Sequence, residues 1–561
     1  GAGWLRGGSR QTEKCRTEGR ENMLYLVLGS FILLMLAVGL VTGLKTKTLH
    51  DFFLGDRSIG PWMSAFAYGT TYFSAVLFIG YAGKFGWSYG LPVLWIAAGN
   101  AILGGLLPWL ILGPRTRYMT AQLGAMTMPE FLEARYGAKS LKIASTLIIF
   151  FFLIPYSAAA YSGLSYLFEG IFNIDYTYAL IGMAALTAFY LVLGGYFAVA
   201  LTDFIQGSIM IAGCILMIGY VLRAPAVGGA GGLVTKLGAV HPDLVRIFPP
   251  SWPQIGWLVL LTSLGAWGMP QMVQKFYAIK SQRTITRAAI VSTAFCLMVA
   301  GTAYLVGATS PLFGPVLVRE NRAVLSAAPE YAEAVQNPAA ARGLLGQAMK
   351  NDAGKVQTEL KYNNTMIVPQ ILKKTLPTLL LMVVLVLVLS ATMSTVSSLV
   401  LVSSSTIAID LLRGAIMPRM KKETSMLISR LLCALFIALS VFVSLQKPRF
   451  LEALMSYSWG TIAGAFLGPY VLGLFWKRVT RAAVWCGMAA GVGLSLYSFF
   501  SANYGWFGGL VSLADAPMYG SLSMLASLAV VLVASLLTSA VRAEAVEKAF
   551  AGASASAAAK E

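Results

Sequence analysis

Blocks of about twenty apolar residues recur along the chain, and this feature limits what the chain can fold into more than any other. A helix of about 20 apolar residues is long enough to cross the hydrocarbon core of a bilayer. The strands of a transmembrane β-barrel would instead alternate over about 10 residues, a pattern that these blocks do not show. Of the 561 residues, 57% are hydrophobic and 12% charged, whereas soluble domains carry about 25% charged residues. We therefore expect an all-α polytopic membrane protein.

About thirteen such blocks can be counted from Met23 onward, and each is expected to form one transmembrane helix. The expected spans are residues 23–44, 60–82, 90–113, 141–170, 174–196, 200–222, 254–277, 286–310, 376–405, 426–446, 451–476, 480–501 and 520–541. Residues 1–22 are polar and basic, and we interpret them as a non-native or disordered tail. Residues 542–561 form a short tail after the last span.

Basic residues gather in alternate loops, which is the pattern of cytoplasmic loops in membrane proteins. They follow the first, third, seventh, ninth and eleventh spans, and Lys275, Lys280 and Arg283 belong to the group after the seventh. We predict that the N-terminus lies outside and the C-terminal tail in the cytoplasm, across the inner or plasma membrane of the cell. These loops also account for the net charge of +19, so no nucleic-acid partner is expected.

Residues that could support an enzyme are scarce in the apolar blocks. The 5 cysteines are scattered, and the 2 histidines, His50 and His241, lie far apart in expected loops. A buried nucleophile with its base, or a transition-metal site, is therefore not expected, and neither is a bound cofactor. A channel might show a ring of charges or a repeated filter, and a sensor would carry an output domain; neither is visible in the sequence.

Two expected spans are interrupted at similar depth. Span 60–82 contains Gly69, Thr70 and Thr71 in its middle, and span 254–277 contains Gly268 followed closely by Pro270. One interrupted helix can be an ordinary kink. Two of them, five spans apart, are typical of inverted-repeat transporters, in which the unwound backbone binds a cation or a small solute.

The ninth span is rich in hydroxyl side chains. Ala391, Ser394 and Thr395 lie on one helical face, and Ser397 and Ser398 continue that face a turn further on. Na⁺ is a hard cation that prefers oxygen ligands. Hydroxyls in membrane helices also bond back to their own helix or join neighbouring helices, which is the alternative interpretation for any one of them.

Asp203 stands at the start of the expected sixth span. Carboxylates inside membranes are costly and usually functional. The alternative is that Asp203 caps the N-terminus of that helix.

Several motifs together resemble the sodium:solute symporter family. They are Asp51-Phe-Phe-Leu-Gly-Asp-Arg-Ser58, Thr127-Met-Pro-Glu-Phe-Leu-Glu-Ala-Arg-Tyr-Gly137, Pro270-Gln-Met-Val-Gln-Lys-Phe-Tyr-Ala278, the segment 391–405, and Gly464-Ala-Phe-Leu-Gly-Pro469 with Phe475-Trp-Lys-Arg478. The resemblance implies a leucine-transporter-like fold of two inverted five-helix repeats that works by alternating access. The repeats would be 45–222 and 254–476, the second including an outer loop 310–377, with extra helices in 23–44 and 480–541.

The resemblance also implies cation sites. The main sodium site would combine the carbonyl groups of Thr70, Phe73 and Ala391 with the hydroxyls of Ser394 and Thr395. A second sodium site, present in some members, would match Asp203, Ser394, Ser397 and Ser398. The coupling ion would be Na⁺, and a proton is the competing choice. Against the proton, the hydroxyl-rich ninth span is neutral, whereas proton relays favour acidic or histidine side chains.

The solute site is matched through four positions. Tyr156 and Pro270 agree with the sodium/proline branch of the family, whereas Ala266 replaces an aromatic residue and Tyr72 replaces an aspartate of that branch. The implied function is symport of Na⁺ with a small organic solute: an amino acid, monocarboxylate, vitamin, sugar or sialic acid. The expected partners are Na⁺, the solute and the lipid bilayer, and a monomer should suffice for transport.

Overall fold

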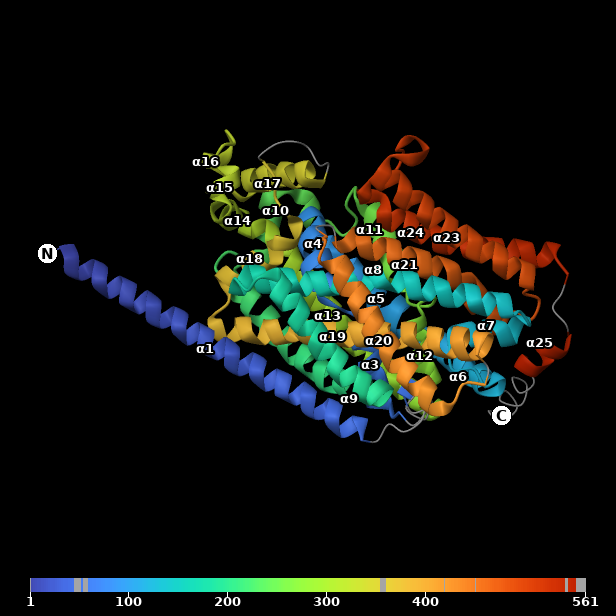
Figure 1. The fold of residues 1–561 in the computed structure, drawn as a ribbon. Coiled ribbons are helices and arrows are strands. Elements are labelled where there is room, and N and C mark those ends of the chain that lie inside the picture. Colours follow the sequence, from blue (N-terminus) through green and yellow to red (C-terminus); the bar gives the residue numbers. More distant parts are fainter. Residues whose placement is uncertain are drawn as a thin grey trace.

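The computed structural model describes residues 2–44, 52–53, 59–353, 360–417, 419–448, 451–539 and 543–550. These residues form a helical bundle, with one isolated β-bridge between Ile59 and Ile279 (Figure 1). Most of the motif 51–58 and most of the tail 542–561 lie outside the described residues. The expected all-α fold is confirmed.

The helices of the first half have the following bounds: α1 Ala2–Gly43, α3 Pro61–Tyr72, η2 Val76–Tyr81, α4 Ala82–Tyr89, α5 Leu94–Ala101, η4 Ile102–Leu106, η5 Pro108–Leu112, α6 Gly113–Leu123, α7 Met128–Tyr136, α8 Lys139–Phe172, α9 Tyr176–Arg223 and α10 Gly229–Val240. Those of the second half are α11 Trp252–Val259, η7 Leu260–Leu264, α12 Pro270–Tyr277, α13 Gln282–Ala308, α14 Gly314–Glu320, α15 Arg322–Leu325, α16 Tyr331–Ala334, α17 Pro338–Ala353, α18 Ile367–Thr375, α19 Thr378–Ser405, η10 Thr406–Ile416, α20 Lys422–Ser444, α21 Leu451–Leu467, α23 Arg481–Tyr504, α24 Ala516–Leu537 and α25 Ala543–Phe550.

Ten helices in the described residues are long and apolar enough to cross a membrane, or eleven if a bent pair counts as one span. The count differs from thirteen for two reasons. The 48-residue α9 covers two expected spans, 174–196 and 200–222, which meet near a kink at Gly195, where φ is 55°. The expected span 254–277 is divided among α11, η7 and α12, each too short to cross alone. The count of thirteen stays a prediction.

The helix α1 begins before the first apolar block. It includes residues 2–22, although only Asn22–Gly43 is apolar enough to span a membrane, and a disordered tail stays a prediction. A helix grows easily from an existing one, because adding a residue avoids the cost of nucleation. The interpretation of 1–22 as a non-native tail stays a prediction.

Both expected spans are interrupted, but the first break lies later than predicted, because Gly69, Thr70 and Thr71 are still helical. Helix α3 ends at Tyr72 and Phe73 is extended, with φ −118° and ψ 120°, before the chain continues into η2 and α4 at a bend of 46°. In the second case Met269 is extended and α12 begins with Pro270, whose missing N–H and fixed φ suit the first position of a helix. The Ile279–Ile59 bridge joins the segment after α12 to the segment before α3.

The hydroxyl-rich helix α19 lies in the interior, where it packs against α3, α8, α9 and α20. Helix α1 lies along α9 at the edge of the bundle (Figure 1). The segment that contains α14 to α17 gathers at one end, over its own small core around Trp87, Phe313 and Leu317. Helices α23 and α24 pack on α21. The broken helices therefore meet α19 in the centre.

Close packing between α21 and α23 gives a stability prediction. A Cβ atom added at Gly491 would lie 2.1 Å from the carbonyl oxygen of Gly464, so the two backbones touch there. We expect Gly491→Ala to destabilise the protein by about 1–3 kcal/mol, the usual cost of overpacking. Thermal unfolding in detergent measures the effect. Gly493→Ala is the matched control, because a Cβ there meets nothing within 4 Å; equal melting temperatures for the two variants would contradict the prediction.

Candidate functional site

The end of α3 meets α19 at a cluster of oxygen atoms. The Thr395 hydroxyl oxygen lies 3.0 Å from the carbonyl oxygen of Ala391 and 3.2 Å from those of Thr70 and Thr71. A hydroxyl has one proton, so it can donate fully to only one of these three acceptors. The remaining lone pairs of these oxygen atoms face one another in the protein interior. Such a cluster is suited to a cation.

The broken helix supplies this arrangement. The last carbonyl groups of a helix have no partner within it, and the helix dipole makes that end negative. Thr70 and Thr71 stand in the last turn of α3, and Phe73 follows in extended conformation, so its carbonyl group is turned out of the helical direction. Beyond the break, the Thr392 hydroxyl accepts a hydrogen bond of 3.3 Å from the Ala75 N–H, which holds the unwound segment against α19. Of the predicted main-site residues, Thr70, Ala391 and Thr395 are thus in contact.

A second polar cluster surrounds Asp203. The Ser394 hydroxyl donates to Asp203 Oδ1 at 2.6 Å, and the Ser397 hydroxyl donates to the Ser394 carbonyl at 2.9 Å. Asp203 lies well inside α9, beyond the kink at Gly195, and is fully buried. The alternative that it caps a helix N-terminus is therefore wrong. Ser398 also belongs to this cluster, which it joins through a hydrogen bond from Lys275, a residue that was not predicted to lie there.

Lys275 links Asp203 and Ser398. Its ammonium lies 3.5 Å from Asp203 Oδ2 and donates to the Ser398 hydroxyl at 3.0 Å. The Ser398 hydroxyl is also 2.8 Å from that of Thr71. Lys275 is 1% exposed, so its interpretation as a loop charge after the seventh span is wrong. A basic residue near the end of an apolar block resembles an interfacial charge in the sequence, but the break before α12 places it inside the bundle.

A small cavity of about 20 Å³ lies beside the break in α3. Its lining consists of Tyr72, Phe73, Ser74, Leu77, Tyr81, Asn100, Thr262, Tyr304, Met455 and Trp459, none of which carries a formal charge. The Tyr72 hydroxyl donates to the Thr262 carbonyl at 2.6 Å, and Asn100 Oδ1 accepts from the Thr262 hydroxyl at 2.8 Å. A volume of this size holds about one water molecule, so the site is closed tightly.

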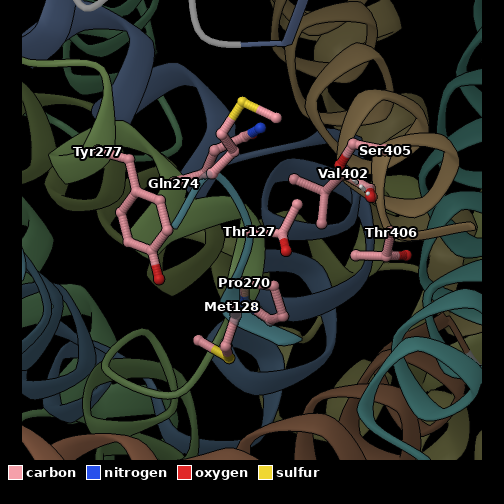
Figure 2. A pocket seen from close by; sticks show the side chains of 9 residues that line it. Thr127, Met128, Pro270, Gln274, Tyr277, Val402, Ser405 and Thr406 are labelled. Atoms are coloured by element: carbon pink, nitrogen blue, oxygen red, sulfur yellow. Dashed lines mark hydrogen bonds between the residues drawn. The ribbon is translucent and has the colours of Figure 1, made fainter. Parts of the chain in front are cut away.

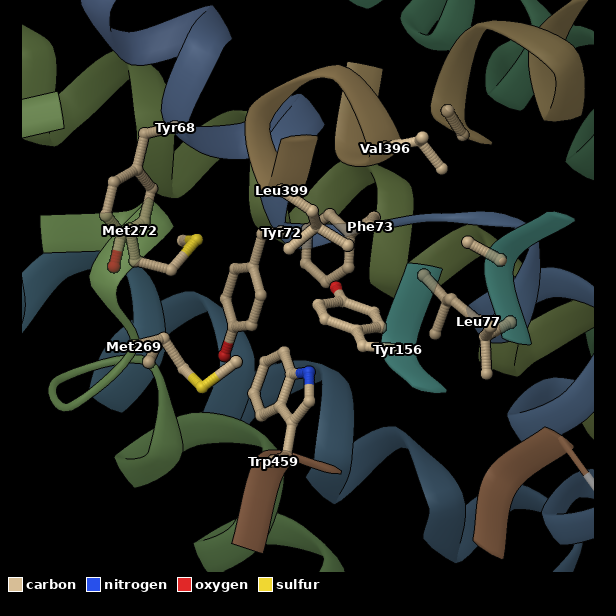
Figure 3. Packing of buried hydrophobic residues seen from close by; sticks show 14 of the residues in the cluster. Tyr68, Tyr72, Phe73, Leu77, Tyr156, Met269, Met272, Val396, Leu399 and Trp459 are labelled. Atoms are coloured by element: carbon tan, nitrogen blue, oxygen red, sulfur yellow. The ribbon is translucent and has the colours of Figure 1, made fainter. Parts of the chain in front are cut away.

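Aromatic side chains converge on this cavity. In Figure 3, Tyr72 and Tyr156 come from different helices and both lie near the indole of Trp459. The rings of Tyr72 and Trp459 stack at 6.0 Å, and that of Tyr156 meets Trp459 edge-on at 5.9 Å. Tyr156 packs against Trp459 but is not itself among the residues that line the cavity. The Tyr156 hydroxyl and the Trp459 indole N–H are both buried and interact with each other, and neither makes a hydrogen bond of normal geometry with the described residues.

The other predicted solute residues lie elsewhere. Pro270 lines a separate cavity of about 10 Å³ together with Thr127, Gln274 and Tyr277 (Figure 2). Ala266 is buried and lines neither cavity. Asn100 and Trp459 were not predicted, because a lone polar or aromatic residue in an apolar span carries no distinctive pattern.

Ion pairs and hydrogen bonds close the bundle on either side of these cavities. Lys84 of α4 pairs with the buried Glu452 of α21 at 2.6 Å, next to Tyr81 of the first cavity, whose hydroxyl is 3.1 Å from that of Ser456. At the second cavity, the Thr127 hydroxyl donates to Asp410 Oδ1 at 2.8 Å. The bundle is closed at both cavities.

Two broken helices around a central oxygen cluster are typical of inverted-repeat membrane transporters. The sodium:solute symporter family matches residues 52–349 and 334–491, and the chain belongs to this family.

Individual relatives agree with this assignment. The chain is 29% identical over 470 residues to the osmoregulated proline transporter OpuE of Bacillus subtilis (strain 168), which covers 83% of this chain and 86% of the relative. It is 30% identical over 468 residues to the sodium/proline symporter of Haemophilus influenzae, covering 82% and 85%. Its fold is similar to a Na⁺-coupled sialic acid symporter in a substrate-bound outward-open state, with a TM-score of 0.72 and 18% identity over 92% of this chain and 98% of that one.

Proposed function

We propose that the protein couples the uptake of a small organic solute to Na⁺ by alternating access. The observation that carries this proposal is the oxygen cluster around Thr395, where three backbone carbonyl groups surround one hydroxyl. The Na⁺ ligands would be the carbonyl groups of Thr70, Phe73 and Ala391 and the hydroxyls of Ser394 and Thr395. None of these groups titrates near neutral pH, which favours Na⁺ over a proton at this site.

The proposal includes the larger arrangement expected from the family. Residues 45–222 and 254–476 would be the two inverted repeats, and the site would lie between them. The N-terminus would lie outside and the C-terminus in the cytoplasm, in the inner or plasma membrane. The Lys84–Glu452 pair and the Thr127–Asp410 hydrogen bond each hold the bundle together beside one cavity. In alternating access only one of these contacts would break at a time, so their presence supports the proposal.

The solute would occupy the uncharged cavity beside Tyr72, with Tyr156 and Trp459 as its polar contacts. An uncharged aromatic lining favours a small solute with an apolar part and a few hydrogen-bonding groups. The proline transporters among the relatives make proline one candidate.

A thermal-shift screen of the purified protein tests the proposal. Proline, pyruvate, galactose, pantothenate and sialic acid would be added in NaCl and, separately, in KCl at the same ionic strength. Ligand binding to the native state raises its stability by mass action. We expect one class of solute to raise the melting temperature in NaCl and much less in KCl. A shift of equal size in both salts, or one that depends on pH alone, would contradict sodium coupling.

Tyr156 gives a prediction for the solute found in that screen. Tyr156→Phe removes a hydroxyl whose only neighbour of hydrogen-bonding type among the described residues is the Trp459 indole, so the main loss should be a bond to the solute. We expect affinity to fall by about 1 kcal/mol, or roughly fivefold, measured by titration in NaCl. Tyr161→Phe is the control, because Tyr161 is buried in the same helix but, among the described contacts, its ring does not meet Trp459 as that of Tyr156 does. Equal affinities in wild type and Tyr156→Phe would assign Tyr156 to packing.

A further inference from the structure

Lys275 and Asp203 form a buried ion pair inside the cluster that the family resemblance suggests for a second Na⁺. The ammonium is 1% exposed and the carboxylate 0%. The pair joins the second broken helix, through α12, to α9. The ammonium also lies 5.4 Å from the centre of the Tyr196 ring, a distance at which a cation is attracted to the ring face.

The pair changes the charge balance of the cluster. A Na⁺ ion among Asp203 and three serine hydroxyls would be balanced by the carboxylate. With Lys275 in place, that carboxylate is already neutralised, and an added Na⁺ would have to lie beside the Lys275 ammonium among the same oxygen atoms. Two positive charges so close together repel each other strongly in the protein interior.

The ammonium also uses the oxygen atoms that Na⁺ would need. Asp203 Oδ2 faces Lys275, and the Ser398 hydroxyl accepts a hydrogen bond from it. The Ser394 hydroxyl donates its only proton to Asp203, so this carboxylate oxygen is also engaged within the cluster. The cluster at Asp203 is therefore occupied, whereas no ammonium contacts the carbonyl cluster around Thr395 among the described contacts.

We propose that the Lys275 ammonium takes the place of a second Na⁺, so that the protein binds a single Na⁺, at the main site. This inference rests on the proposed function, because it concerns the number of coupling ions. Lys275 then determines the ion stoichiometry without contacting the solute. Removing its charge while keeping Asp203 converts the cluster into a second sodium site.

Direct binding of ²²Na⁺ to the purified protein in detergent, without solute, tests the proposal. We expect one Na⁺ per wild-type protein and two per Lys275→Met protein. Lys275→Met/Asp203→Asn removes both charges and should return the count to one. Lys275→Arg keeps the charge and should bind one. Lys84→Met is the matched control, because it removes an ammonium from another buried carboxylate and should leave the count at one.

Two Na⁺ per wild-type protein, or one per folded Lys275→Met protein, would overturn the inference and leave sodium coupling intact. No binding to wild type would overturn the proposed function itself. The wild-type and Lys275→Arg counts decide the question even where Lys275→Met does not fold, because two ions bound to either charged protein exclude replacement of Na⁺ by the side chain.

Discussion

Replacing Thr395 with alanine is expected to raise the Na⁺ concentration needed for half-maximal solute uptake by about tenfold or more. The hydroxyl stands among three carbonyl groups, and contacts between a charged group and a neutral polar partner contribute about 1.5–3 kcal/mol. A loss of about 1.4 kcal/mol already corresponds to a factor of ten in affinity. Uptake into proteoliposomes would be measured over a range of NaCl concentrations, with KCl holding the ionic strength constant.

Thr395→Ser is the matched control for this prediction, because it keeps the oxygen atom and loses only a methyl group. Its Na⁺ dependence should remain close to wild type. If Thr395→Ala and wild type need the same Na⁺ concentration, Thr395 is not a ligand, and its contacts with α3 serve packing between the two helices.

Replacing Asp203 with asparagine is expected to destabilise the protein by about 3–5 kcal/mol, because it leaves the Lys275 ammonium buried without a carboxylate. The melting temperature in detergent measures this loss. Lys275→Met/Asp203→Asn should regain most of it, since neither charge then remains. A residue that only capped a helix would tolerate asparagine with little loss.

Glu452→Gln provides a comparison for the Asp203 prediction. It breaks the Lys84–Glu452 pair, but Lys84 is 27% exposed and can reach its surroundings when its partner is lost. Its destabilisation should therefore be smaller than that of Asp203→Asn. Equal melting temperatures for wild type and Asp203→Asn would contradict the pairing with Lys275.

The helices of the fold could be predicted from the sequence because membrane spans depend on local composition. The existence of the interruptions at Phe73 and before Pro270 was also predictable, since glycine, hydroxyl residues and proline stand near them, although the first break lies a few residues after the predicted Gly69–Thr71. The division into spans was less certain. Gly195 stands at the kink of α9, but a kink and a turn between two spans leave the same pattern in sequence.

The candidate site could be predicted only where its residues share a helix. Ala391 and Thr395 lie one turn apart on α19, and helical spacing alone places the Ala391 carbonyl beside the Thr395 hydroxyl. Lys275 and Asp203 are far apart in sequence, so nothing local indicated that they form a pair. The carbonyl group of Thr71 was missed for a related reason, because backbone acceptors have no signature in the residue types.

The central claim is that a Na⁺ gradient drives solute accumulation. The most direct test uses proteoliposomes loaded with KCl and diluted into NaCl, with the radiolabelled solute that the thermal-shift screen identifies. The account predicts that the internal solute concentration rises transiently above the external one, and that equal Na⁺ on both sides abolishes this rise. Equal accumulation when KCl or choline chloride replaces external NaCl, or accumulation driven by a pH gradient without Na⁺, would contradict it.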